Sequence, residues 1–443
     1  MSTLYLPAQL RDLTDGNDGL QLEGTRVRDI LTTLRECYPK TAGWLTDEQG
    51  RLRPHVKVFL NGEVVGLNDA VGDKDEIRIL PAISGGSDSV EVLVGTRKGL
   101  FILSGEPGTE MDVTARAFEG QEVEYAIKDP PTGTYLASVT NPYFGPRIYF
   151  TDDPNGKWDH GEGPAFPEDT GATVTRIWKI HPGEEEGVLW AGIAPAALFR
   201  SEDGGRSWDL NRPLWDVPGR EKWEGGAGGL CLHSICPWPG DPDRMAIGIS
   251  AAGVWLTEDG GSSWHQAVKG LAPRYVPEDA REANTSFCVH NLHRSPVEPA
   301  TLYMQFHGGV YRSEDAGETW IDIGSDTGLP SDFGFPLVVD PRRSDRAWVI
   351  PLVADMDRTT PEGRVRVFET RDRGTTWAAS SEGLPQENAY LTILRQAFCE
   401  DGREPLGLYF GATSGEVFGS SDEGATWATL ASRLPPVLSV RTG

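Results

Sequence analysis

The stretch SEDGGRSW at residues 201–208 decides the fold, because the chain repeats it. Close copies are TEDGGSSW (257–264), SEDAGETW (313–320), TRDRGTTW (370–377) and SSDEGATW (420–427), and TDDPNGKW (151–158) is a degenerate sixth. The tryptophans that end successive copies are 50 to 57 residues apart. Repeats of this period are typical of four-stranded blades that are arranged around a ring. The motif therefore predicts a β-propeller over most of the chain.

The residues of the motif suit a tight turn. An aspartate accepts backbone N–H bonds within the turn, a glycine adopts a conformation that other residues resist, and the tryptophan packs between blades. The motif resembles the Asp-box, or BNR repeat, of sialidases and of other β-propellers of the YVTN type. We expect a structural role for its aspartates, Asp203, Asp259, Asp315, Asp372 and Asp422. No glutamate stands at the twelfth position of these loops, which argues against calcium.

The repeats also predict how the ring closes. Inner strands are expected near 123–128, 174–180, 231–236, 288–293, 333–339 and 390–396. Two strand-like pieces remain, VEVLVGTRKGLFIL at 90–103 and VLSV at 437–440. Joined, they complete a seventh blade and leave no open sheet edge. The expected fold is mainly β, with a seven-bladed Asp-box propeller at 87–443 that the C-terminal strand closes.

Residues 1–86 have a different pattern. Val27, Ile30, Leu31 and Leu34 fall at i, i+3, i+4 and i+7, which gives one apolar stripe on a helix. Strand-like runs lie before and after this helix. The order predicts a β-grasp (ubiquitin-like) domain at 1–86.

The same region carries a family resemblance. The segments DILTTLRECYP, DEQGRLRPHVKVFLNGEVV and DKDEIRILPAISGG resemble the MoaD/ThiS-like sulfur carriers of molybdopterin and thiamine biosynthesis, which are relatives of ubiquitin. The terminal Gly-Gly of that family maps onto Gly85 and Gly86. The resemblance implies that an E1-like adenylating enzyme activates the carboxylate of Gly86, which then becomes a thiocarboxylate or a conjugate.

The chain departs from that family by continuing with Ser87. A peptide bond has no carboxylate to adenylate, so the implied activity requires a protease that cuts after Gly86, for which we expect a zinc metalloprotease. The alternative is that Gly85-Gly86-Ser87 is only a flexible linker.

Ionisable residues recur along the predicted inner strands. The proline that ends each inner segment, taken as the register, aligns Glu124, Arg176, His233, His290 and Phe335. We expect His307 at a turn on the end of the ring at which the inner strands begin. His293 has the opposite parity to His290 and should point into its blade. The candidate ligand-binding residues of the channel are Glu124, Arg176, His233, His290 and His307.

Two of these histidines belong to a repeated Cys-x-His pattern, Cys231-Leu-His233 and Cys288-Val-His290. Strand alternation places the two side chains of each pair on one face. Together with His307 they form a candidate site for a transition metal such as zinc or iron. The alternative is descent of both pairs from one ancestral blade, without a metal.

Composition limits the partners. The chain has 66 acidic and 41 basic residues and a net charge of -25, which disfavours nucleic acid and membrane surfaces. No apolar run reaches the roughly 18 residues of a membrane span, and the start lacks the pattern of a signal peptide. We expect a cytoplasmic protein with reduced cysteines.

Three functions remain open. The first is a sulfur-carrier precursor fused to a propeller that binds a small molecule or a protein at one face. The second is a propeller hydrolase or lyase, and the third is a non-catalytic assembly scaffold. A sialidase is not indicated, because no Arg-Ile-Pro segment is present and Arg176, Arg312 and Arg395 do not assemble a convincing arginine triad.

Overall fold

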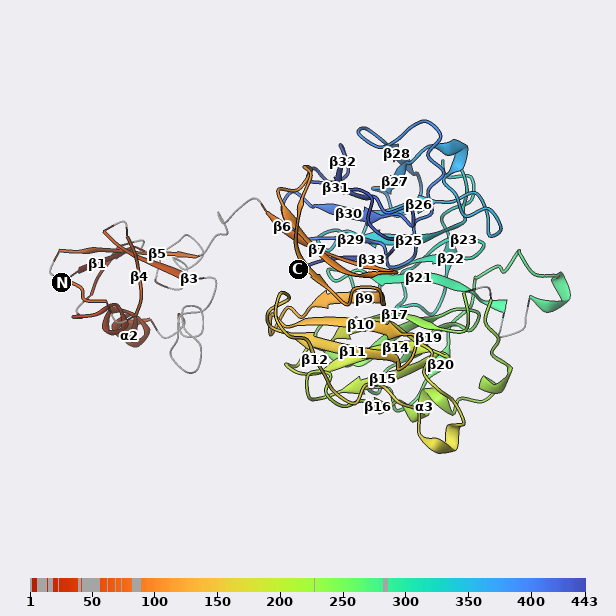
Figure 1. Ribbon diagram of the computed structural model, residues 1–443, viewed down its shortest axis with the longest axis horizontal. Coiled ribbons are helices and arrows are strands. Elements are labelled where there is room, and N and C mark those ends of the chain that lie inside the picture. Colours follow the sequence, from red (N-terminus) through yellow and green to blue (C-terminus); the bar gives the residue numbers. More distant parts are fainter. Residues whose placement is uncertain are drawn as a thin grey trace. The chain divides into compact units, whose positions relative to one another are not determined.

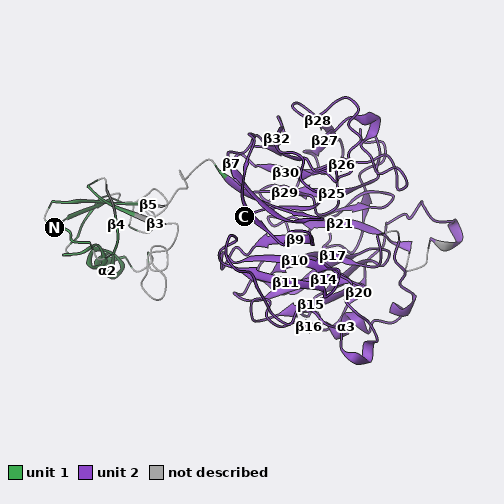
Figure 2. Ribbon diagram, viewed as in Figure 1, with its two compact units in different colours: residues 1–89 green, residues 90–443 purple. Residues whose placement is uncertain are grey.

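The chain folds as two compact units, Met1–Ser89 and Val90–Gly443 (Figure 2). The computed structural model describes residues 2–5, 14, 19–22, 24–38, 41, 56–61, 63–67, 69–72, 74–81, 89–226, 228–281 and 286–443. No helix in these ranges has both the length and the apolar character that a membrane span requires. The five cysteines are free thiols.

The described residues of the first unit form a five-stranded sheet and one helix. The sheet order is β2-β1-β5-β3-β4, and only the pairing of β1 with β5 is parallel. The apolar stripe of helix α2 is buried in the core of this unit, together with Leu4 and Ile77. The β-grasp prediction is confirmed, although the sequence did not predict β2. The elements are β1 (Ser2–Tyr5), β2 (Gly19–Leu22), α2 (Val27–Cys37), β3 (Val56–Leu60), β4 (Glu63–Val65) and β5 (Glu76–Pro81).

The second unit consists of four-stranded antiparallel sheets, of which its described residues contain seven. Six sheets use consecutive strands, and the seventh has the order β33-β6-β7-β8. The C-terminal strand thus pairs with the first strand of the unit, and Figure 1 shows β33 beside β6 and β9.

The strands are β6 (Val90–Thr96), β7 (Gly99–Gly105), β8 (Asp112–Ala117), β9 (Glu122–Lys128), β10 (Tyr135–Asn141), β11 (Gly145–Thr151), β12 (Asp159–His160), β13 (Arg176–Pro182), β14 (Leu189–Ala194), β15 (Ala197–Ser201), β16 (Asp209–Leu210), β17 (Leu232–Trp238), β18 (Asp241–Ile249), β19 (Gly253–Thr257), β20 (His265–Gln266), β21 (Val289–Arg294), β22 (Leu302–Phe306), β23 (Gly309–Ser313), β24 (Ile321–Asp322), β25 (Gly334–Val339), β26 (Ala347–Pro351), β27 (Val367–Thr370), β28 (Ala378–Ser380), β29 (Phe398–Glu400), β30 (Leu408–Gly411), β31 (Val417–Ser420), β32 (Ala428–Ala431) and β33 (Val437–Thr442). The short helical turns are η2 (Glu168–Thr170), α3 (Arg212–Trp215), η3 (Arg220–Lys222), η4 (Glu278–Ala280) and η6 (Pro361–Gly363).

Seven strands, here called the inner strands, connect one sheet to the next. Each contacts the inner strand of the two adjacent sheets, and the series β9, β13, β17, β21, β25, β29, β33 returns to β9. The second unit is therefore propeller-like. The prediction of an inner strand at 390–396 was wrong, because β29 begins at Phe398. Leu391, Ile393 and Leu394 are apolar and pack on the core, but as an irregular segment.

The repeated aspartates fasten the turns between third and fourth strands. Asp315 accepts bonds from the Thr319 N–H at 2.9 Å, the Thr319 hydroxyl at 2.6 Å and the Ser313 hydroxyl at 2.8 Å. Burial raises the pKa of Asp315, but these hydrogen bonds outweigh it and hold the pKa below its usual value. Equivalent bonds from hydroxyl and backbone donors reach Asp203, Asp259, Asp372 and Asp422.

The tryptophans of the motif join neighbouring sheets. Trp320 donates from Nε1 to the Ala267 carbonyl at 3.1 Å, and Trp377 donates to the Ile323 carbonyl at 2.8 Å. Both carbonyls follow the last strand of the preceding sheet. The indole thus buries its ring and satisfies its donor at once.

Candidate functional site

A β-bulge recurs in the inner strands. In β13, Ile177 and Lys179 pair with consecutive residues of β14, so that Trp178 is left over. Glu124, His233 and His290 are left over in the same way in β9, β17 and β21. A bulge leaves its extra residue unpaired and re-aims the side chain. The register that placed Arg176 in this row was therefore wrong, and Trp178 occupies the equivalent position.

Arg176 instead forms an ion-pair cluster with two glutamates. Its Nε lies 3.1 Å from Glu124 Oε1 and its Nη2 lies 3.1 Å from Glu122 Oε2. Burial raises the pKa of Glu124 to about 7, although the charge of Arg176 opposes this. Within the described residues neither carboxylate oxygen of Glu124 has a hydrogen-bond partner of good geometry. A carboxyl group of this kind exchanges a proton near neutral pH, which suits general acid-base chemistry.

His233 and Cys231 are occupied by local hydrogen bonds. His233 is fully buried, its Nε2 donates to the Val289 carbonyl at 2.9 Å, and its Nδ1 lies 3.0 Å from the Ser234 hydroxyl. Burial, and next the charge of Arg395, lower the pKa of His233. Cys231 Sγ lies 3.5 Å from the Ser250 hydroxyl and 3.3 Å from Arg395 Nη1. Both ring nitrogens of His233 are engaged, which leaves none for a metal.

Cys288, His290 and His307 lie together. One donor atom from each falls within 4.8 Å of the others. Cys288 and His290 come from the start of β21, and His307 comes from the turn between β22 and β23. The structure thus brings together three of the five predicted metal ligands in one group, which does not include Cys231 and His233.

The sequence analysis did not predict the contacts of three cationic side chains, Lys179, Arg395 and Arg441. Arg395 is 8% exposed, and its guanidinium carbon lies 5.0 Å from the ring centroid of Trp178 and 5.7 Å from that of Phe335. Lys179 Nζ and Arg441 Nε each lie 2.7 Å from the hydroxyl of Tyr125. Burial raises the pKa of Tyr125, but these two cations outweigh it and lower the pKa. These contacts cross between sheets, so spacing along one strand gave no signal for them.

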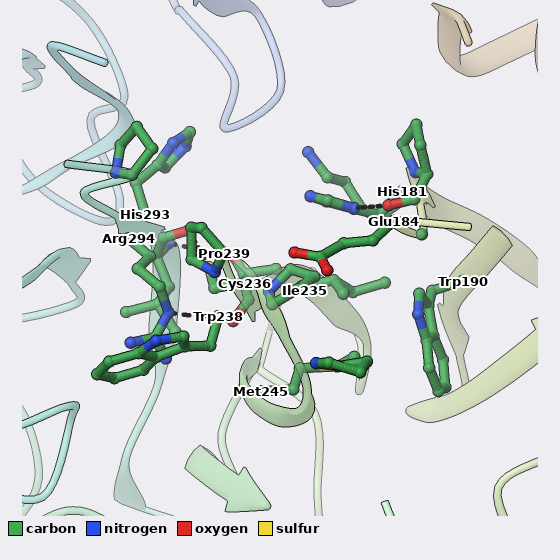
Figure 3. A pocket seen from close by; sticks show the side chains of 18 of the residues that line it. His181, Glu184, Trp190, Ile235, Cys236, Trp238, Pro239, Met245, His293 and Arg294 are labelled. Carbon is green, nitrogen blue, oxygen red and sulfur yellow. Dashed lines mark hydrogen bonds between the residues drawn. The ribbon is translucent and has the colours of Figure 1, made fainter. Parts of the chain in front are cut away.

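A cavity of 640 Å³ lies toward the C-terminal ends of the inner strands, whereas Cys288 and His290 lie at the start of β21. Figure 3 shows His181 and Trp190 on one side of it, and Trp238 and Arg294 on the other. His293 also lines the cavity, so the prediction that it points into its blade was wrong. The bulge at His290 adds one residue to the strand and reverses the parity of everything after it.

The sequence also predicted a carrier terminus. Gly85 and Gly86 fall outside the described residues. Among the described residues, β5 is the last strand of the first unit and ends at Pro81, and β6 of the second unit begins at Val90.

Comparisons with known proteins separate the two parts of the chain. Residues 4–86 match the ThiS family. The sulfur carrier protein CysO of Mycobacterium tuberculosis is 31% identical over 90 residues, which are 19% of this chain and 97% of that protein. A xyloglucanase of Hypocrea jecorina is 28% identical over 160 residues, which are 35% of this chain and 18% of the enzyme, so the chain spans less than a fifth of that relative. The solved structure of an ancestral GH74 enzyme is 13% identical with a TM-score of 0.46, and the match covers 80% of this chain and 40% of that one.

Proposed function

Because residues 4–86 of this chain belong to the ThiS family, we propose that the protein is the precursor of a sulfur carrier or ubiquitin-like modifier. Residues 1–86 are the carrier domain and residues 87–443 a propeller domain. Hydrolysis of the peptide bond between Gly86 and Ser87 releases the carboxylate of Gly86. That carboxylate is the reacting group of the mature carrier.

One coincidence carries this proposal. The family match ends at residue 86, the first compact unit ends at Ser89, and the first strand of the second unit begins at Val90. A cut after Gly86 therefore falls within three residues of the boundary between the two units and interrupts none of the described strands. Two glycines also suit a narrow protease or activating site, because they carry no side chains.

The chemistry defines the partners. A protease, for which a zinc metalloprotease is our candidate, supplies the free carboxylate. An E1-like adenylating enzyme then joins this carboxylate to the α-phosphate of ATP and releases pyrophosphate. A sulfide donor or an amine displaces AMP, which yields a thiocarboxylate or an amide conjugate.

We further propose that the seven sheets are the blades of one closed ring. The pairing of β33 with β6 and the circular series of inner-strand contacts support this reading. A ring closed in this way lies wholly within residues 90–443. Its folding is then independent of the carrier domain.

Intact-mass measurement of the protein from its own cells tests the processing. We expect two fragments, one ending at Gly86 and one beginning at Ser87, and a chain with both Gly85 and Gly86 replaced by alanine serves as the uncut control. Purified carrier 1–86 should release pyrophosphate with the adenylating enzyme and ATP, whereas the full chain should not. A single full-length species under every growth condition would overturn the proposal.

A second function, binding of a small anion by the propeller domain, rests on a separate observation. Lys179, Arg395 and Arg441 have no carboxylate within 4.0 Å in the described parts of the chain, although the protein carries a net charge of -25. Buried cations normally have a counter-charge. A carboxylate or phosphate compound that enters from the 640 Å³ cavity supplies one.

Thermal unfolding with citrate, phosphate and sulfate tests this second function. We expect at least one anion to raise the midpoint, and the effect to disappear in Lys179→Met. Lys157→Met is the control, since Lys157 is an exposed residue that already pairs with Asp159. An equal shift in both variants would show general salt stabilisation and reject the site.

A further inference from the structure

Two segments of one sheet converge at the cluster of Cys288, His290 and His307. The His307 N–H donates to the Cys288 carbonyl at 3.0 Å, which ties the turn after β22 to the start of β21. The three donor atoms fall within 4.8 Å of one another. Donors around a tetrahedral zinc ion, with bonds of about 2.0–2.3 Å, are roughly 3.3–3.8 Å apart. The side chains need to contract by only about 1 Å to share an ion.

His290 already has the tautomer of a metal ligand. Its Nδ1 donates to the Gly334 carbonyl at 2.6 Å, so the lone pair of the neutral ring is on Nε2. Among the described residues, no hydrogen bond involves Nε2 of His290, and His290 is 3% exposed. Phe335 stacks on the ring at a centroid distance of 4.6 Å and fixes its plane. Ligating histidines commonly donate their second N–H to a backbone carbonyl in this way.

Tyr275 supports the other two side chains. Its ring lies 4.1 Å from that of His307, and its hydroxyl accepts from the Cys288 N–H at 2.9 Å. The same hydroxyl donates to the Ser286 carbonyl. One aromatic residue therefore positions both the thiol and the second imidazole.

A carboxylate lies at the edge of the cluster. Asp355 Oδ2 is 4.0 Å from His307 Nε2, and Asp355 Oδ1 accepts from Arg358 at 2.8 Å. A thiolate at Cys288 and this carboxylate place two negative charges near a divalent cation, and Arg358 offsets one of them. His307 and Cys288 keep partial exposure, which gives an ion a path from solvent.

The preceding sheet supplies an internal contrast. Cys231 and His233 repeat the Cys-x-His spacing, but both nitrogens of His233 are engaged by Val289 and Ser234. The same sequence pattern thus gives a histidine with both nitrogens engaged in β17 and a histidine whose Nε2 lone pair is available in β21. The tertiary surroundings, and not the motif, distinguish the two.

We propose that Cys288, His290 and His307 bind one zinc ion through Sγ, Nε2 and an imidazole nitrogen, with a fourth coordination position open to water or to an oxygen ligand. Thiolate and imidazole together favour zinc over magnesium or calcium. Three protein ligands with one open position is the arrangement of zinc sites that bind and polarise an oxygen ligand. The proposal does not depend on cleavage at Gly86.

Cobalt substitution in the full-length, chelator-treated protein tests the site. We expect one equivalent of Co²⁺ to bind, with a sulfur-to-cobalt charge-transfer band and visible bands of a four-coordinate ion, and Zn²⁺ to remove both. Cys288→Ser should abolish the charge-transfer band, and His307→Gln should weaken binding at least about 10-fold. Cys231→Ser, the matched control, should keep the band and the affinity.

Tryptophan fluorescence confirms that each variant is folded before the titration. Absence of the charge-transfer band in the folded natural chain would overturn the site. So would a band that survives Cys288→Ser, or one that Cys231→Ser removes. Zinc content of the protein purified without chelator, at about one ion per chain, is the second readout.

Discussion

Replacing Glu124 by glutamine tests whether burial or the ion pair with Arg176 dominates at the centre of the propeller domain. The Glu124 side chain is 4% exposed, and burial raises its pKa from 4.5 to about 7 despite the arginine 3.1 Å away. Because the folded-state pKa lies above the unfolded value, this group contributes stability below pH 4.5 that is lost as pH rises to about 7. At about 1.36 kcal/mol for each pKa unit, the loss amounts to roughly 3 kcal/mol.

Urea unfolding at two pH values measures this loss. Thirteen of the fourteen tryptophans lie in residues 90–443, so fluorescence reports mainly on the propeller domain. Since glutamine has no charge to bury, Glu124→Gln should be more stable than the natural protein by roughly 3 kcal/mol at about pH 8. At about pH 5 the two should differ by less than about 1 kcal/mol.

Glu122→Gln is the matched control, because Glu122 contacts the same arginine at 3.1 Å but its side chain is 30% exposed. An exposed ion pair contributes about 1 kcal/mol or less, so this variant should show little change at either pH. A Glu124→Gln variant that is less stable than the natural protein at about pH 8 would refute the reasoning. A difference that does not change with pH would also refute it.

Three further predictions use stability as the readout. Gly383→Ala should lose more than about 2 kcal/mol in urea unfolding, because a Cβ there would lie 1.9 Å from the Trp427 carbonyl oxygen. Gly133→Ala, at a similar positive φ but with nothing within 4 Å, should lose only about 1 kcal/mol, and equal losses would contradict the clash. Asp315→Asn should lose about 1 kcal/mol at neutral pH. Because hydrogen bonds hold the pKa of Asp315 below 3.8, that difference should shrink as pH falls through and below this value. A difference that stays constant with pH would show that the carboxylate charge does not cause it. The fragment 87–443 should unfold within about 2 °C of the propeller transition of the full chain in thermal fluorescence scans, and a larger drop would mean that the carrier domain supports the propeller.

Local chemistry made the turns and the helix predictable. The aspartate turn is built from residues within four positions of each other, as Asp315 and Thr319 show, so a short motif contains all of its partners. The α2 stripe likewise depends only on helical spacing, and Leu34 at its end is fully buried. The six copies of the motif also predict six of the seven described sheets, because each copy belongs to one sheet.

The centre of the propeller domain could not be predicted in the same way. The proline register failed in β13 because Trp178, its bulge residue, lies four residues before Pro182, whereas the bulge residue of β9, β17 and β21 lies six residues before the proline. The bulge in β21 also turned His293 to the cavity side, and no residue type in the sequence indicates a bulge of this kind. Arg395 lies at the end of the irregular segment for which the sequence predicted an inner strand, 390–396. Its neighbours, among them Cys231, come from other sheets.

The sequence by itself determined that the chain joins a β-grasp carrier to an array of repeated four-stranded units, because spacing and turn chemistry act over a few residues. Only the tertiary structure decided which polar side chains meet. Cys231-x-His233 and Cys288-x-His290 have the same spacing, yet one histidine is engaged at both nitrogens and the other keeps Nε2 free beside a thiol and a second imidazole. Hydrogen bonds and ring contacts from neighbouring strands make this difference, and they exist only when the sheets are packed together.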